Sequence, residues 1–233
     1  MTRPVVLSLA LCAAALVGAA PIPPEAKVRQ RYGAWLDPDK DCTLEILKSE
    51  AIKVGVPGTP HSMREGLGKW NSPRMWQNVT GDFVATVRVA FPIPGPGAAY
   101  TETNRHAVHA AGLIVWASDD DHLRLVRQAH TSDKGPEEQY SQYLPHLGGK
   151  GGKIHSYVPS SERPPASARL RLQRTGGKVT CLVTRDGVDE DYKFGAVEVG
   201  WGETVKVGVV AENGYPAPFE ATFDEYTVTV PNK

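Results

Sequence analysis

The chain has 233 residues, and its 26 Lys and Arg residues balance its 26 Asp and Glu residues, so the formal net charge is zero. This balance gives no basic field that would attract nucleic acid or an anionic lipid surface. The 23 glycines and 19 prolines, with few helix-length periodic segments, favour many short strands joined by turns. A single all-β domain of this length is ordinary.

The first twenty residues have the pattern of a signal peptide. Residues 1–3 are short and basic, residues 5–17 form an apolar run too short to span a bilayer, and residues 18–20 are small. We therefore predict a signal peptide over residues 1–20, export to the periplasm or the cell exterior, and no membrane span in the mature chain. A retained N-terminal anchor is the alternative.

The next segment, residues 21–31, is Pro-rich and charged, which predicts a flexible leader before a single domain at residues 32–233. Near the start of this domain Asp37, Asp39 and Asp41 alternate as Asp-x-Asp-x-Asp. Calcium loops use such spacing because neighbouring carboxylates can surround one hard cation. The turn glycine and the distal Glu of an EF-hand do not fall in place, so a solvated acidic turn stays an alternative. No other cofactor is expected.

Alternation of apolar and polar residues predicts half-buried strands along the domain. A short pair is expected at residues 42–47 and 51–56, and a longer strand at 83–91. Together with a segment at 139–144, the later strands are expected near residues 168–172, 179–183, 192–194, 205–209, 219–224 and 228–230.

A β-hairpin is predicted in the middle of the chain, where apolar runs at residues 111–117 and 122–128 flank a Ser-Asp-Asp-Asp turn. The first run is apolar on both faces, so we expect both faces of this strand to be covered. In the second run Arg124 alternates with leucines, which predicts a face turned toward water or a ligand.

Two cysteines, Cys42 and Cys181, remain after removal of the predicted signal peptide. An exported chain with two cysteines can form one disulfide. This bond would close a loop long enough to contribute roughly 4–5 kcal/mol by the loop-entropy estimate. Two separate buried thiols are the alternative.

Several short motifs occur in a characteristic order. They are Trp35-Leu36-Asp37-Pro38-Asp39 with Asp41-Cys42, Asn71-Ser72-Pro73-Arg74, Gly81-Asp82-Phe83, residues 111–116, Leu123-Arg124-Leu125, residues 168–172, Asp186-Gly187 and residues 222–226. In order and spacing they resemble the DUF1349 proteins of the concanavalin A-like lectin/glucanase superfamily, which also carry the label "regulation of enolase".

The resemblance implies an all-β jelly-roll sandwich of two antiparallel sheets. Members of the superfamily bind or cleave glycans, often on the concave sheet, but the family itself implies no particular activity. The family often has a carboxylate after the Arg-Leu pair of the central hairpin, whereas this sequence has Val126 there. A polar site carried over from the family is therefore incomplete at this position.

A glycan site needs aromatic platforms for the apolar sugar face and planar polar groups for the hydroxyls. For the tryptophans, packing in the core is the alternative, and we expect it for Trp116. The candidate ligand-binding residues are Trp70, Arg74, Trp76, Arg124, Glu212, Asn213 and Tyr215.

These observations predict an exported, non-catalytic domain that binds carbohydrate or another cell-envelope component. The first alternative is a divergent glycoside hydrolase, which needs two carboxylates across one glycosidic bond. Glu220 and Asp224 share a face of one predicted strand, although a solvated edge strand is the simpler explanation. The second alternative is a structural or protein-interaction domain, which would present a flat apolar patch. We assign no catalytic residue.

Overall fold

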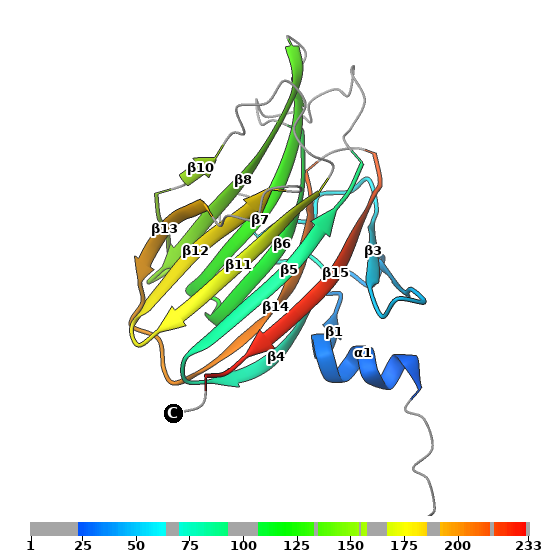
Figure 1. Ribbon diagram of the computed structural model, residues 1–233. Helices are drawn as coiled ribbons and strands as arrows, with labels where there is room; N and C mark the ends of the chain where they lie inside the picture. Colours follow the sequence, from blue (N-terminus) through cyan, green and yellow to red (C-terminus); the bar gives the residue numbers. More distant parts are fainter. Residues whose placement is uncertain are drawn as a thin grey trace, which may run out of the picture.

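The computed structural model describes residues 23–63, 70–92, 107–132, 135–153, 155–157, 167–185, 192–214 and 217–231, which form two stacked antiparallel sheets and one helix (Figure 1). Sheet A has the order β1 (Ala34–Leu36), β4 (Arg74–Thr80), β14 (Thr204–Asn213), β6 (Ala107–Ser118), β7 (Asp121–Ser132), β8 (Gly135–Leu147) and β10 (His155–Tyr157), with β9 (Lys150–Gly151) paired to β8. Sheet B has the order β13 (Tyr192–Glu198), β12 (Lys178–Arg185), β11 (Ser167–Thr175), β5 (Phe83–Ala90), β15 (Phe219–Thr229), β3 (Ile52–Val56) and β2 (Thr43–Ile46). The predicted all-β sandwich of two antiparallel sheets is confirmed.

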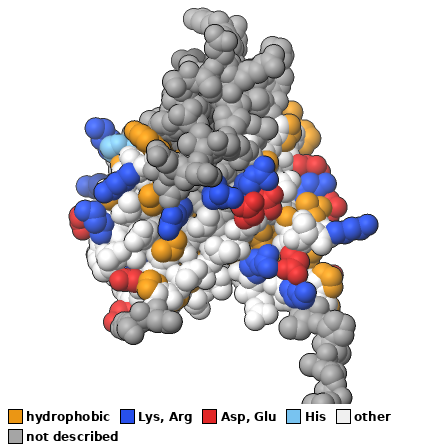
Figure 2. All heavy atoms as spheres, in the orientation of Figure 1, with side chains coloured by type: hydrophobic (Ala, Val, Ile, Leu, Met, Phe, Trp, Pro, Cys, Tyr) orange, Lys and Arg blue, Asp and Glu red, His pale blue; other side chains and the backbone are white. Residues whose placement is uncertain are grey.

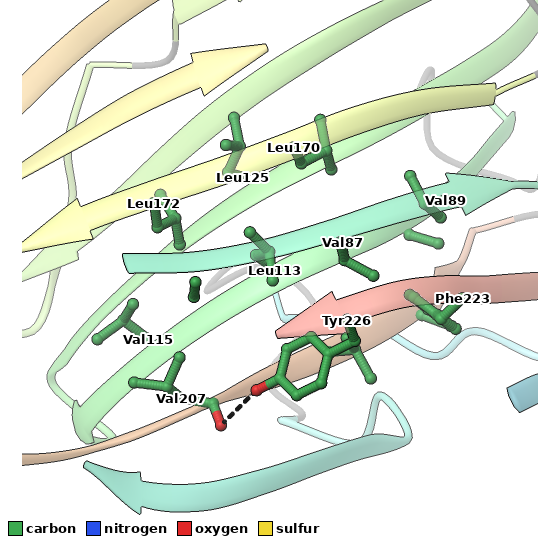
Figure 3. Packing of buried hydrophobic residues seen from close by; sticks show 14 of the residues in the cluster. Val87, Val89, Leu113, Val115, Leu125, Leu170, Leu172, Val207, Phe223 and Tyr226 are labelled. Carbon is green, nitrogen blue, oxygen red and sulfur yellow. Dashed lines mark hydrogen bonds between the residues drawn. The ribbon is translucent and has the colours of Figure 1, made fainter. Parts of the chain in front are cut away.

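The main hydrophobic core lies between the two sheets (Figure 3). In β5 buried side chains alternate with half-buried ones, as the sequence pattern predicts. Leu113 and Leu125 come from sheet A, and Val87 and Leu170 come from sheet B; all four are fully buried. Each such side chain contributes roughly 1.5–3 kcal/mol when it leaves water.

The central hairpin forms from β6 and β7, and both faces of β6 are covered, as predicted. Leu113 and Val115 face the main core. Ile114 and Trp116 pack into a second, smaller cluster on the outer face of sheet A, by which we mean the face turned away from sheet B. Ala117, the last residue of the predicted apolar run, is exposed, and the register shifts at this point, between Trp116 and Ser118.

The predicted flexible leader is wrong from residue 24 onward, because this segment is helix α1 (Pro24–Tyr32). Proline at the first helical position suits a helix start, and Val28 and Tyr32, four residues apart, are buried on one side. The hydroxyl of Tyr32 donates to the carbonyl of Phe223 at 3.0 Å, and its ring stacks on Tyr226 with centroids 4.7 Å apart. Two buried aromatic contacts therefore order a segment whose composition suggests flexibility.

Gly33 ends this helix with a φ of 88°, and a Cβ there would lie 2.0 Å from the carbonyl oxygen of Trp76. Only glycine allows the chain to turn this closely against β4 before β1 begins.

The predicted disulfide is also wrong, because Cys42 and Cys181 are both free. Cys42 directly precedes β2 at one edge of sheet B, whereas Cys181 lies in β12, five strands away. Strands about 4.8 Å apart place the thiols on the order of 20 Å from each other, far beyond disulfide reach. Burial raises the pKa of both thiols, and Asp37 and Asp41 raise that of Cys42 further.

Charged side chains of both signs lie on the outer face of sheet B (Figure 2), and several of them form ion pairs. Lys53 lies 2.7 Å from Glu45 and 3.4 Å from Glu220, and Arg88 lies 3.3 Å from Asp224. Such exposed pairs contribute at most about 1 kcal/mol each, and they are typical of a solvated surface. Among the described residues no helix is long and apolar enough to cross a bilayer.

Candidate functional site

The outer face of sheet A brings together five of the seven predicted ligand-binding residues. Arg74 and Trp76 come from β4, Glu212 from β14 and Arg124 from β7, while Trp70 lies just before β4. These strands are near neighbours in the sheet, and every second residue of a strand faces the same side. The fold thus gathers residues that lie more than a hundred positions apart in the sequence.

Asn213 and Tyr215 do not join this group. The side-chain amide of Asn213 donates to the carbonyls of Pro57 at 2.6 Å and Ala217 at 2.9 Å, so it fixes neighbouring loops. Tyr215 lies outside the described residues, as does the predicted signal peptide at residues 1–20.

A row of aromatic rings crosses the outer face of sheet A from β4 to β8. Trp76 lies 5.5 Å from Trp116, Trp116 stacks on His122 at 4.7 Å, and His122 stacks on His146 at 4.7 Å. Trp70 meets Trp116, His122 and His146 edge-on. The expected burial of Trp116 is confirmed, but its ring belongs to this outer row and not to the core between the sheets.

The two histidines were missed in the sequence analysis, although strand parity could have found them. His122 precedes Arg124 by two residues and so faces the same side, and His146 is its cross-strand partner in β8. Burial, then the charges of Arg124, His146 and Arg74, lower the pKa of His122 to about 3. A hydrogen bond to the backbone of Asp119 opposes this shift without cancelling it, so the imidazole is neutral at physiological pH.

Arg74 is a buried cation without a carboxylate partner among the described side chains. Its guanidinium donates to the carbonyls of Ser72 at 2.8 Å and Trp70 at 3.0 Å, and it lies 4.7 Å from the centre of the Trp76 ring. Among the described residues, none accepts its Nε–H. Burial lowers the pKa of Arg74 to about 10, and the charge of Asp119 opposes this shift, so the side chain stays cationic.

Arg124 was expected to face water or a ligand, but it is buried and paired. Its guanidinium donates to Glu212, and the side chains are only 5% and 7% exposed. The second carboxylate oxygen of Glu212 accepts the backbone N–H of Met63 at 3.2 Å. Residues 61–63, which we call the strap, therefore lie against this face and help to cover it.

The outer face remains accessible beside β4, near the β1 end of the sheet. Trp76 is half-buried, while Asn78 and Lys206 are exposed beside it, with the Lys206 ammonium 4.7 Å from the centre of the Trp76 ring. A surface hollow of about 540 Å³ opens here, and its lining consists of Arg29, Gly33, Ala34, Trp76, Gln77, Asn78 and Lys206. This hollow offers a ring, amides and cations to a solute.

The three aspartates suggested for calcium do not converge on one point. Asp37 accepts the backbone N–H of Cys42 at 2.8 Å, Asp39 accepts from the Asn71 amide at 2.7 Å, and Asp41 contacts His61 at 2.9 Å. Each carboxylate is engaged with a different group, one within the loop and two on later segments, so the arrangement differs from a calcium cage.

The carboxylate pair suggested for hydrolysis lies elsewhere. Glu220 and Asp224 lie on β15, which is a central strand of sheet B and not an edge, and each contacts a cation there. On the outer face of sheet A, the acidic side chain of Glu212 is held by Arg124.

No protein-family model matches the sequence, and curated protein sequences give no match either. Solved structures do match. A functionally unknown protein from Saccharomyces cerevisiae aligns with TM-score 0.65 and 17% identity, over 88% of this chain and 99% of that chain. The GH43 protein BlXynB from Bacillus licheniformis aligns with TM-score 0.59 and 12% identity, over 84% of this chain and 37% of that chain.

A legume lectin-like domain from Entamoeba histolytica aligns with TM-score 0.52 and 10% identity, over 96% of this chain and all of that domain. These likenesses show the fold, which is the concanavalin A-like jelly-roll sandwich that the sequence motifs imply. Membership of the DUF1349 family stays a prediction. Structural similarity at such low sequence identity shows a shared architecture, and the function has to be argued from the residues of the site.

Proposed function

We propose that this domain is a non-catalytic carbohydrate-binding module that uses the outer face of sheet A. The observation that carries the proposal is the aromatic row, which ends at the half-buried ring of Trp76 in an open hollow beside Asn78 and Lys206. Sugars present an apolar face that packs on such a ring and hydroxyls that bond to amides and cations.

Lys206 is the group that a sugar would displace. Its ammonium lies over the Trp76 ring, but the side chain is exposed, and such a contact contributes only about 0.5–1 kcal/mol. A pyranose ring could take this place on Trp76 while the ammonium turns to bond a hydroxyl. The Arg74 guanidinium, 4.7 Å from the centre of the same ring, stays in place because carbonyl groups hold it.

The test is a glycan array with the mature chain, with and without calcium, followed by calorimetry on the glycans that bind. Loss of the ring contact in Trp76→Ala removes about 1.5–3 kcal/mol of apolar burial, which corresponds to a ten- to hundredfold weaker affinity. Asn78→Ala should weaken binding by a smaller factor, because it removes one polar contact.

Tyr192→Ala is the matched control, because Tyr192 is an aromatic side chain 51% exposed on sheet B. We expect it to bind glycans as the unchanged protein does. Equal binding by Trp76→Ala would refute the placement of the site, and no binding to any glycan would favour an interaction domain of the cell envelope. Release of reducing sugar from a bound glycan would contradict the non-catalytic part of the proposal.

We also propose export, on the basis of the signal-peptide pattern at residues 1–20. Mass spectrometry of the protein isolated from the periplasm or the medium should give a mature N-terminus near residue 20. A full-length chain in the cytosolic fraction would contradict this proposal.

A further inference from the structure

A second group of chemically active side chains lies away from the outer face of sheet A, where the loop before β2 meets the segment after β3. Asp41, Cys42 and His61 each direct one donor atom to this corner, and the three atoms lie within 4.8 Å of one another. His61 Nε2 is 2.9 Å from Asp41 Oδ1, and Cys42 Sγ is 3.6 Å from the same oxygen.

The imidazole of His61 is oriented as in a metal ligand. Its Nδ1 lies 2.8 Å from the carbonyl oxygen of Thr59, and because a carbonyl can only accept, Nδ1 carries the hydrogen. Nε2 is then the atom turned toward Asp41 and Cys42. Metal-bound histidines commonly donate their other N–H to a backbone carbonyl in this way, which fixes the tautomer and the ring plane.

The backbone around His61 is also fixed. It exchanges two hydrogen bonds with Asn213, at 2.7 and 2.9 Å, and the histidine is only 1% exposed. The ring therefore has little freedom to turn away from the corner.

The two segments that carry the donors are tied to each other. Asp37 accepts the N–H of Cys42 at 2.8 Å, which shapes the first loop. The Asn71 amide donates to Asp39 at 2.7 Å and accepts the N–H of Ser62 at 2.9 Å, so one buried side chain joins both segments. In addition to the direct contacts among the donors, these bonds hold the two segments together through other atoms.

We propose that Asp41, Cys42 and His61 bind a zinc-like divalent cation. One carboxylate, one thiolate and one imidazole form a borderline-soft set that suits Zn²⁺, whereas calcium prefers oxygen ligands alone. A tetrahedral zinc with bonds of about 2.0–2.3 Å needs ligand-to-ligand edges of about 3.3 Å for N to O and 3.5 Å for S to O. The observed 2.9 and 3.6 Å are close to these lengths.

The fourth position would be taken by water. The Asp41 side chain is 42% exposed, and it also lines a surface hollow of about 440 Å³ beside β3 and β15. Solvent and small ions therefore reach the corner without any rearrangement of the sandwich. Three protein ligands and one water satisfy zinc coordination.

The test uses the chelator-treated mature chain under reducing conditions and Co²⁺ as a spectroscopic substitute for Zn²⁺. Bound Co²⁺ should give a thiolate-to-cobalt charge-transfer band and the visible bands of a tetrahedral site, and Zn²⁺ should displace it. Loss of a ligand should weaken zinc binding by more than the roughly 10- to 100-fold that outer partners contribute.

The variants are Cys42→Ser and Asp41→Asn, with Cys181→Ala as the control because Cys181 is the other, core-buried thiol. Zinc should raise the Tm of the unchanged protein and of Cys181→Ala, but not that of the two ligand variants. Since Asp41 is exposed and Cys42 half-buried, both ligand variants are expected to fold, which near-ultraviolet circular dichroism checks.

Three results would overturn the proposal: no cobalt spectrum, a spectrum without the thiolate band, or equal zinc affinity in Cys42→Ser. The remaining explanation would then be a His61–Asp41 ion pair that happens to lie beside a thiol. Because neither variant touches the aromatic row, failure of the metal site leaves the glycan proposal standing.

Discussion

Substitution of Arg124 by methionine should destabilise the protein strongly, because it leaves a buried carboxylate behind. Glu212 is 7% exposed on its side chain and is bound by two groups, the guanidinium of Arg124 and the backbone N–H of Met63. Methionine replaces much of the arginine stem, so the main loss is the countercharge and not the packing.

The expected cost follows from this environment. Removal of one partner of a buried ion pair costs about 3–5 kcal/mol, since the other charge remains in a site that water does not reach. The free energy of unfolding of most domains is about 5–15 kcal/mol, so this loss is a large part of it. A shift of roughly 2–4 °C per kcal/mol gives a Tm lower by about 6–20 °C.

Urea denaturation of Arg124→Met and of the double variant Arg124→Met/Glu212→Gln measures this effect. The glutamine keeps the shape of the side chain and an oxygen for the Met63 N–H, but it carries no charge. We expect the double variant to regain most of the lost stability. The comparison of single with double variant cancels any other contact that Arg124 makes. A single variant that loses less than about 1 kcal/mol, or a double variant no better than the single, would refute the reasoning.

Two further predictions concern the aromatic row and the helix. The pKa of His122 is lowered to about 3, against about 6.5 in an unfolded chain, so stability should fall as the pH drops below 6.5, by about 2 kcal/mol at pH 5. His122→Phe should flatten this part of the stability–pH curve in urea titrations at pH 7 and 5, whereas an unchanged slope would contradict the burial argument. Tyr32→Phe should cost about 0.5–1.5 kcal/mol in the same assay, because it loses the bond to the Phe223 carbonyl but keeps the ring stack. No loss would mean that α1 does not dock through this bond.

The fold could be predicted because two signals agree along most of the chain. Period-two alternation marks strands such as β5 and β11, and Gly-rich or Asp-rich turns mark their ends. The helix α1 was missed because its local sequence signals point away from the observed structure. In α1 a proline and several charged residues suggest a leader, and the two residues that order it, Val28 and Tyr32, contact strands that are remote in the sequence.

The site could be predicted in part, because residue type suggests chemistry while only the sheet order brings residues together. Five candidates met on one face, since β4, β14 and β7 carry four of them with the same parity and Trp70 lies just before β4. Arg124 was expected to be open to a ligand, but its partner Glu212 is 88 positions away and pairing across a sheet is not visible in a single sequence. The predicted disulfide was wrong for a similar reason. The number of cysteines suggests a bond, but the order of the strands places the two thiols far apart.

The strap links the two proposed sites. His61 carries a metal donor at one end, and two residues later Met63 packs on the outer face and holds Glu212 through its N–H. Two residues span at most about 7 Å, so a cation that fixes His61 also restrains the segment that covers part of the aromatic face. If a glycan shifts this segment when it binds, metal and glycan affinities must change together, because coupling between two sites is reciprocal. If the strap does not move, the bound cation at His61 holds it as a rigid edge of the glycan site. The metal then stabilises the folded protein without changing the glycan affinity.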